Sequence, residues 1–377
     1  MIQHAFTASR KALTAERFQL ENRLYQGCPT IACTKGGKIY AGWYSGGSKE
    51  PSLLNYNLLT VSGDGGKNWR ELFVLEGCPD QKIQALDIEI FIDPLARLWV
   101  CWVQRNWALP RNAPGHLNQW AMICADPDSE EPEFSAPFFL GEGFMRCAPE
   151  FLADGRWLFP AYNWMTDNYA FFETADQGEH FSPCSGPKKI STDFDEAMFL
   201  ETADHEKVMM LARTTCGALA YTESADSGRR WSEPVLRRDL PDPGSRFFWK
   251  RLPSGRILMV KNLSPEKRVM MSAMLSEDEG KTWPFVLTLD ARETSYPEAA
   301  LAFDGSIFIV YDRGRCSHKE ILLSRITERE ILQGKISDPA SFLNRIISKA
   351  PEIPALGRWY REAVTLYDNQ LISLPLI

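Results

Sequence analysis

The stretch SEDEGKTW at residues 276–283 decides the fold, because related octets recur along the chain at a nearly constant interval. The copies are SGDGGKNW at 62–69, SADSGRRW at 224–231 and the weaker TADQGEHF at 174–181, and the degenerate CADPDSEEPEFSAP lies at 124–137. The aspartates of the last three octets are 50 and 52 residues apart, and the first two octets are separated by 112 residues, about two such periods. A fixed period in this range indicates a repeat architecture.

A second motif occurs six times out of phase with the first. Each copy is a hydrophobic run, a polar turn resembling Asp-Gly, and another hydrophobic run: PTIACTKGGKIYAGWY, IEIFIDPLARLWVCWV, PEFLADGRWLFPAY, EAMFLETADHEKVMMLAR, FWKRLPSGRILMVKN and PEAALAFDGSIFIVYD. Short polar turns between such runs are typical of β-hairpins, and a repeat of about 50 residues holds four strands. The sequence therefore predicts an all-β protein, a six-bladed β-propeller of four-stranded antiparallel blades, formed by residues 1–377 as one domain. A solenoid of the same repeats is the alternative, but the chain lacks capping segments.

The last apolar run, AVTLYDNQLISLPLI at 363–377, follows the sixth copy. We expect it to form a strand pair that shares a blade with N-terminal residues and so leaves no long sheet edge exposed.

The octets are predicted to be structural. Their Ser or Thr hydroxyl and Asp carboxylate can bond nearby backbone N–H groups, their Gly allows a positive φ, and their Trp can pack under the hairpin. Equivalent residues of different blades cannot converge on one active site.

Composition excludes several classes of function. The net charge of −7 opposes a nucleic-acid partner, and no apolar run approaches the length that spans a membrane. Nine scattered cysteines are expected to be reduced and mostly buried, and without a metal-ligand pattern we predict no metal and no cofactor.

The N-terminus carries no apolar secretory signal, so the chain as numbered is expected to be cytoplasmic, or secreted if a signal was removed. The oligomeric state stays open.

The octet SEDEGKTW fits the Asp box, SxDxGxTW, and the chain resembles the sialidase (neuraminidase) superfamily of six-bladed propellers over nearly its whole length. The resemblance implies a carbohydrate substrate and assigns roles to four residues. In DEAMFLETADHEKVMMLAR, Glu196 and Arg213 match a family glutamate and arginine; in SYPEAALAFDG, Tyr296 matches the nucleophilic tyrosine; and Arg268 matches an arginine that precedes an Asp box. Glu196 would then be the base that activates Tyr296, and the two arginines would bind a substrate carboxylate.

Two family features are absent. The arginine of the RIP motif in the first blade is replaced by the first residue of Gly27-Cys28-Pro29, and the acid/base aspartate before the first octet has only Asn55, Tyr56 and Asn57 near its expected place. Loss of a proton donor typically costs about 100-fold to 10,000-fold in rate. We therefore expect an exo-acting glycoside hydrolase that acts on an acidic or non-sialic glycan, rather than a classical sialidase.

Other charged residues begin inner strands, where propellers bind ligands. The candidates for substrate binding are Glu89, Arg146 and Glu150 at such places, Arg313 just after the sixth inner strand and His116 on a long loop. Asp87, Asp195, Arg246 and Glu298 also begin inner strands, and Asp312, Arg315 and His318 lie in the same segment as Arg313. Two other functions stay open: a lyase acting on uronate polysaccharides, with a tyrosine or His116 as base, and a glycan-binding propeller without catalysis.

Overall fold

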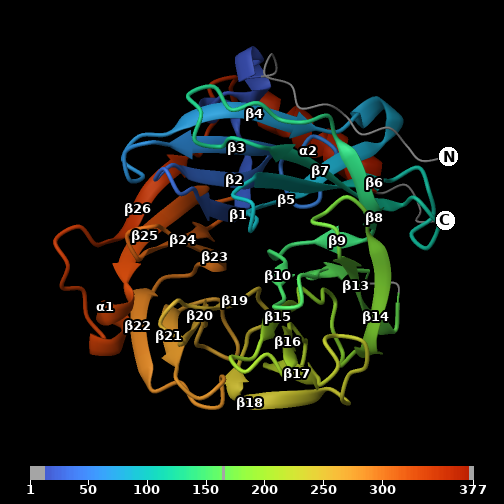
Figure 1. Cartoon of the computed structure of the whole chain (residues 1–377). Coiled ribbons are helices and arrows are strands. Elements are labelled where there is room, and N and C mark those ends of the chain that lie inside the picture. The colour runs from blue at the N-terminus through green and yellow to red at the C-terminus, as the bar shows by residue number, and fades with distance from the viewer. Residues whose placement is uncertain (1–12, 164–165, 373–377) are drawn as a thin grey trace. The chain divides into compact units, whose positions relative to one another are not determined.

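The structure is a computed structural model that describes residues 13–163 and 166–372. The described residues contain six four-stranded sheets, in which neighbouring strands follow one another along the chain (Figure 1). The third sheet departs from this order, because one strand between its second and third strands pairs in a separate two-stranded sheet. The protein is a six-bladed β-propeller with four-stranded antiparallel blades, so the predicted fold class is confirmed.

Each blade is formed by one continuous stretch of chain. Blade 1 contains β1 (Tyr25–Cys33), β2 (Ile39–Gly46), β3 (Tyr56–Ser62) and β4 (Arg70–Glu76); blade 2 contains β5 (Ile83–Ile92), β6 (Leu98–Asn106), β7 (Leu117–Cys124) and β8 (Phe138–Glu142). Blade 3 contains β10 (Glu150–Phe151), β11 (Trp157–Phe159), β13 (Asn168–Thr174) and β14 (Ser182–Lys188), beside the pair β9 (Phe144–Met145) and β12 (Ala161–Tyr162).

The last three blades repeat the pattern. Blade 4 contains β15 (Met198–Glu201), β16 (Val208–Ala212), β17 (Ala218–Ser224) and β18 (Val235–Pro241); blade 5 contains β19 (Phe248–Arg251), β20 (Ile257–Asn262), β21 (Met271–Ser276) and β22 (Phe285–Asp290); blade 6 contains β23 (Ser295–Leu301), β24 (Ser306–Arg313), β25 (Glu320–Thr327) and β26 (Phe342–Lys349). Short 3-10 turns occur at η2 (Glu16–Phe18), η3 (Leu20–Asn22) and η4 (Pro79–Gln81).

Both sequence motifs have the predicted places. The six hydrophobic hairpins are the first two strands of the six blades, and the octets join the third strand of a blade to its fourth. In the octet at 276–283, the Ser276 hydroxyl accepts a hydrogen bond from the Gly280 N–H at 2.9 Å and donates one to Asp278 Oδ1 at 2.8 Å. Asp278 Oδ1 also accepts from the Thr282 N–H at 2.8 Å. In blade 6 a helix, α1 (Glu328–Gln333), replaces the octet and begins with a capping box formed by Thr327 and Glu330.

The blades pack through the apolar faces of their strands. One cluster joins Leu152, Phe171, Phe199 and Met210 of blades 3 and 4, and the octet tryptophan Trp231 packs against it with its ring 5.7 Å from that of Phe199. The octet at 224–231 therefore closes a hairpin and also extends the core beneath it.

The expected C-terminal strand pair is wrong. Residues 358–372 form the helix α2 (Arg358–Ile372), and blade 1 is complete without them. Val364 and Asp368 are buried and four residues apart, a spacing that places them on one face of a helix. The rest of that expected pair, residues 373–377, lies outside the described residues.

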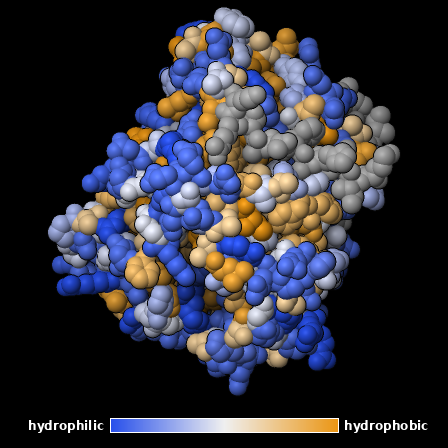
Figure 2. All heavy atoms as spheres, turned by 45° about the horizontal axis from the view of Figure 1, so that its top comes forward, coloured by the Kyte–Doolittle hydropathy of each residue, from blue (hydrophilic) through white to orange (hydrophobic). Residues whose placement is uncertain are grey.

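The chain divides into two compact units. The first is Met1–Phe144 with Ala299–Leu323 and Asn344–Ile377, and the second is Met145–Glu298 with Ser324–Leu343. None of the described helices is long and apolar enough to cross a membrane. Hydrophilic residues cover most of the surface visible in Figure 2, and hydrophobic residues interrupt it in small patches. All nine cysteines are free; four are buried, three are intermediate and two are exposed, so fewer are fully buried than the predicted majority.

Candidate functional site

Three non-glycine residues with positive φ lie in the first strand of a blade, and a fourth lies two residues before one. They are Cys28 (55°) in blade 1, Asp87 (52°) in blade 2, Glu196 (36°) just before blade 4 and Tyr296 (56°) in blade 6. The strand register shifts at the first two, between Gly27 and Thr30 and between Leu86 and Glu89. Such irregularities redirect a side chain and are common next to active sites. The four residues are therefore candidates for function on backbone geometry alone.

In the second unit, Tyr296 and Glu196 are in direct contact. The Tyr296 hydroxyl donates a hydrogen bond to Glu196 Oε1 at 2.8 Å. Arg213, which follows β16, uses Nη1 to contact both Glu196 Oε2 at 2.8 Å and the Tyr296 hydroxyl at 3.1 Å. Three residues from blades 4 and 6 thus form one closed group, and all three were assigned to the site from sequence.

Glu196 is held in its charged form. Burial opposes ionisation of its carboxyl, but the charge of Arg213 and its hydrogen bond outweigh this, and the pKa of Glu196 is lowered. Glu196 is therefore a carboxylate at neutral pH and accepts a hydrogen bond from the Tyr296 hydroxyl.

Two further arginines lie beside Tyr296. The guanidinium carbon of Arg268 is 5.5 Å from the centroid of the Tyr296 ring, and that of Arg146 is 5.7 Å from it. Arg268 is half-buried and donates from Nη2 to the Gly244 carbonyl at 3.1 Å, whereas Arg146 is fully buried. Two guanidinium groups therefore lie close to the Tyr296 ring, and that of Arg268 stays partly accessible to solvent.

A polar and an aromatic residue precede Glu196 in the chain. Asp195 is buried and pairs with Lys189 at 2.7 Å, and burial raises the pKa of its carboxyl to about 6. The ring of Phe194, partly exposed, lies 5.3 Å from the guanidinium carbon of Arg213. The loop before β15 thus supplies a buried charge pair and a partly exposed aromatic ring that lies against Arg213.

In the first unit, Arg315 fills the space beside Gly27. A Cβ atom at Gly27 would lie only 2.7 Å from Cγ and Cδ of Arg315. Arg315 Nε donates to Asp312 Oδ2 at 3.0 Å, and its Nη1 donates to Glu50 Oε2 at 2.7 Å. The first strand has no arginine at position 27. The side chain of Arg315, from the turn after β24, lies beside that position instead.

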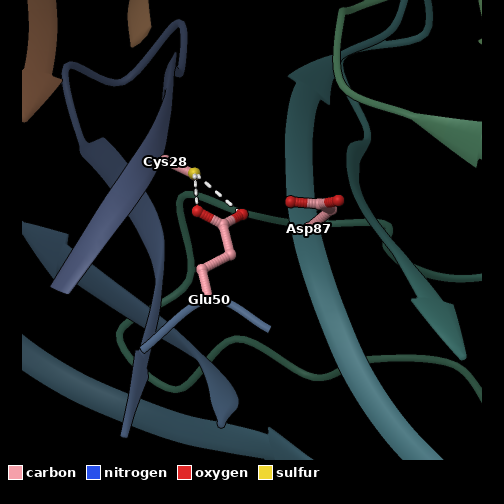
Figure 3. A group of neighbouring side chains, drawn as sticks. All are labelled: Cys28, Glu50 and Asp87. Atoms are coloured by element: carbon pink, nitrogen blue, oxygen red, sulfur yellow. Dashed lines mark hydrogen bonds between the residues drawn. The ribbon is translucent and has the colours of Figure 1, made fainter. Parts of the chain in front are cut away.

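Glu50 is the functional candidate that the sequence reasoning missed. Its carboxyl is partly exposed, accepts a hydrogen bond from the Tyr25 hydroxyl at 2.7 Å, and lies 3.8 Å from the Cys28 sulfur. Figure 3 shows Asp87, on β5, facing this pair. In the sequence, Glu50 lies twelve residues before Ser62. It is therefore outside residues 55–57, where the family's acid/base aspartate was expected.

Cys28, Glu50 and Asp87 offer ligand atoms within 4.8 Å of one another, as a metal site would. The Arg315 guanidinium already balances the charge of Glu50, which argues against a cation there. The prediction that no metal is needed stays a prediction.

Asn55 and Asn57 are structural. Asn57 Oδ1 accepts from the Ile88 N–H at 3.2 Å, and Asn55 Nδ2 donates to the Lys49 carbonyl at 2.9 Å. Both side chains are buried.

The remaining predicted binding residues do not touch the Tyr296 group in the contacts that the structure records. Glu89 is fully buried and accepts from the Thr30 hydroxyl at 3.2 Å, and Glu150 Oε1 accepts from the Glu201 N–H at 3.1 Å. Arg313 pairs with Glu320 at 2.8 Å. His116 immediately precedes β7, and its Nε2 accepts from Arg105 Nε at 3.2 Å. Their roles in substrate binding stay predictions.

Comparison with known proteins agrees with this fold. Residues 104–309, more than half of the chain, match the model of a family described as BNR repeat-like domain. The chain belongs to that family. No curated protein has a sequence that matches this BNR repeat-like protein.

Solved structures of sialidases share the fold. A Hadza microbial sialidase is 18% identical with a TM-score of 0.65, covering 81% of this chain and 66% of its own. The intramolecular trans-sialidase from Ruminococcus gnavus, in complex with oseltamivir carboxylate, is 13% identical with a TM-score of 0.64, covering 83% and 96%. The leech intramolecular trans-sialidase, with 2,7-anhydro-Neu5Ac, is 11% identical with a TM-score of 0.66, covering 82% and 69%. At these identities the likeness shows the fold alone.

Proposed function

We propose that this sialidase-superfamily protein is an exo-acting glycoside hydrolase that acts on an anionic glycan, with Tyr296 as nucleophile and Glu196 as its base. The observation that carries the proposal is the closed contact of the Tyr296 hydroxyl with Glu196 and Arg213. The structural likeness to proteins described as sialidases supports the substrate class.

The chemistry follows from the group. As the phenol oxygen bonds to the anomeric carbon, its proton passes to Glu196 Oε1, and the bond from that carbon to the leaving oxygen breaks. The leaving oxygen takes a proton from solvent and departs as an alcohol. Water then attacks the anomeric carbon and the bond to the Tyr296 oxygen breaks; that oxygen recovers the proton held by Glu196, and the proton that water loses passes to solvent. A neutral phenol suits an anomeric centre that bears a carboxylate, because an anionic nucleophile would be repelled.

Arg268 and Arg213 would bind the substrate anion. Arg268 is half-buried and its guanidinium lies beside the Tyr296 ring, so it can face both the ring and a ligand. Arginine binds a planar carboxylate through paired, charge-assisted hydrogen bonds.

The test is a panel of sialosides, uronides and rhamnosides incubated with the purified protein and analysed by mass. Hydrolysis adds water to the products, and elimination by a lyase does not. For a glycan that is cleaved, Tyr296→Phe and Glu196→Gln are expected to lower kcat by at least about 100-fold.

Tyr221→Phe is the matched control, because the Tyr221 hydroxyl also donates to a carboxylate, Glu223 Oε2, at 2.7 Å. It should leave kcat unchanged. Full turnover by Tyr296→Phe would overturn the assignment of the nucleophile, and binding of a glycan without any turnover would favour a non-catalytic propeller.

A further inference from the structure

Tyr296 has a backbone conformation that its own sequence does not favour. Its φ is 56°, in the left-handed region, which costs about 1–3 kcal/mol for a non-glycine residue and persists only where surrounding contacts impose it. The next residue is Pro297, and a proline favours an extended conformation in the residue before it. Contacts from elsewhere in the fold must therefore hold the start of β23.

Arg246 supplies such contacts. It lies two residues before β19, and its Nη1 donates to the Pro297 carbonyl at 2.6 Å, while its Nη2 pairs with the Glu298 carboxylate. The two acceptors belong to the two residues that directly follow Tyr296. One guanidinium therefore fixes the chain on the C-terminal side of the reactive tyrosine.

The buried Arg246–Glu298 ion pair is expected to add little net stability to the fold. The Arg246 side chain is fully buried and that of Glu298 is 2% exposed. Removing two charges from water can cost as much as their attraction returns, and well-packed apolar residues often replace a buried pair without loss of stability. Retaining the charges is more easily explained by the orientation that they impose.

We propose that the Arg246–Glu298 pair is a positioning device that aims the Tyr296 hydroxyl at Glu196. The inference rests on the proposed role of Tyr296 but does not require that its substrate be known. Arg246 and Glu298 act through the backbone of β23, so neither is a catalytic residue. The same loop before β19 includes Gly244, whose carbonyl accepts from Arg268, so it also holds a second residue beside the Tyr296 ring.

The decisive variant is Arg246→Met/Glu298→Leu, which removes both charges and keeps most of the volume. Its control is Arg156→Met/Glu173→Leu, which removes another arginine–glutamate pair of the second unit. Arg156 immediately precedes β11, Glu173 lies in β13, and Nη1 and Oε2 are 2.7 Å apart. Urea unfolding establishes which variants are folded. Should the first variant fail to fold, Glu298→Gln, which keeps the shape and an acceptor, replaces it.

The readout is the 13C NMR signal of Tyr296 in protein labelled at the tyrosine Cζ, identified by its loss in Tyr296→Phe. This signal reports the hydrogen bonding of the phenol and needs no substrate. We expect it to move in Arg246→Met/Glu298→Leu toward its position in Glu196→Ala, and to stay in place in the control. An unmoved Tyr296 signal in a folded Arg246→Met/Glu298→Leu protein would refute the positioning role.

Turnover provides the second arm. For any glycan that the wild type cleaves, kcat is expected to fall at least about 10-fold in Arg246→Met/Glu298→Leu, with KM changed far less. If the signal moves but no glycan is ever cleaved, the proposed function fails while the positioning role stands. If kcat is unchanged, the pair does not position the nucleophile.

Discussion

At the scale of the residue, the central feature is one guanidinium nitrogen that serves two partners. Arg213 Nη1 lies 2.8 Å from Glu196 Oε2 and 3.1 Å from the Tyr296 hydroxyl. A planar guanidinium can hold both distances at once, whereas an ammonium on a flexible chain is a single point of charge. The group therefore depends on the shape of Arg213 as well as on its charge.

Arg213→Lys is expected to lower kcat by about 10- to 100-fold, equal to about 1.4–2.8 kcal/mol in activation free energy, with little change in stability. The measurement is steady-state kinetics on a glycan from the panel. Arg237→Lys is the control, because Arg237 also pairs with a carboxylate, Asp239, and lies 5.8 Å from a tyrosine ring centroid. Equal losses in the two variants would contradict a special role for Arg213.

Sequence spacing singled out three residues that the structure brings into contact, but it did not single out Glu50. Tyr296, Glu196 and Arg213 lie at fixed places in regular repeats, so the blade period aligns them. Arg315 and Glu50 are 265 residues apart and belong to loops, where no period applies. The sequence shows that position 27 is a glycine, but it does not show that the Arg315 side chain occupies the space beside it.

At the scale of the element, the octets stabilise the turns between the third and fourth strands of their blades through the same hydrogen bonds. In three of them the serine hydroxyl accepts from a glycine N–H at 2.9 to 3.0 Å and donates to the aspartate at 2.8 to 2.9 Å, at Ser62, Ser224 and Ser276. The serine side chains are buried, so a lost partner is not replaced by bulk water.

Ser276→Ala is expected to lower the free energy of unfolding by about 1–3 kcal/mol, because the buried Gly280 N–H loses its acceptor. Urea unfolding measures the change. Ser224→Ala should cost a similar amount, since its contacts are the same, and neither change should alter turnover. A loss of activity without a loss of stability would show that the octets do more than hold the fold.

The C-terminal helix is the element that the sequence reasoning placed wrongly. Its residues contain an apolar run that fits a strand pair, but the buried positions Val364 and Asp368 follow the helical period. Asp368, an aspartate inside that run, is buried in the structure. Its carboxylate accepts from the Ser48 N–H at 3.0 Å and the Ser48 hydroxyl at 2.6 Å, so a tertiary contact overrides the local pattern.

Asp368→Ala is therefore expected to release α2 from the loop that precedes β3. Amide hydrogen exchange within 358–370 should become at least about 10-fold faster, since two or more buried hydrogen bonds to a charged group are lost. Asn369→Ala is the control, because Asn369 is exposed and contacts only the half-buried Lys49 in the recorded bonds. Unchanged exchange in Asp368→Ala would mean that apolar packing alone holds the helix.

At the scale of the whole molecule, repetition explains why the fold was predictable and the substrate was not. Six similar hairpins and several octets specify the same blade again and again, so errors in one repeat do not affect the result. The residues around the Tyr296 group differ between blades, as Arg146 and Arg268 beside its ring show. Those differences carry no period.

The whole protein also has a built-in response to pH, through His116. Its side chain is buried and lies beside Arg105, and burial, with the charge of Arg105, lowers its pKa to about 4. An unfolded histidine has a pKa of about 6.5. Between these values the unfolded chain binds a proton that the folded protein does not, so the contribution of His116 to stability is complete above about pH 6.5 and is lost as the pH falls through about 4.

His116→Gln should remove this contribution, because glutamine stays neutral and its carbonyl can accept from Arg105. We expect the free energy of unfolding of the wild type to fall by roughly 1–3 kcal/mol more than that of His116→Gln between pH 7 and pH 4. Urea unfolding at a series of pH values measures the difference, in which the shared titration of the carboxylates cancels. His180→Gln is the control: exposed His180 pairs with Asp176, which raises its pKa, so the sign of its effect is opposite. Parallel pH profiles for the wild type and His116→Gln would show that His116 is not held neutral, and would reopen it as a proton-transferring residue.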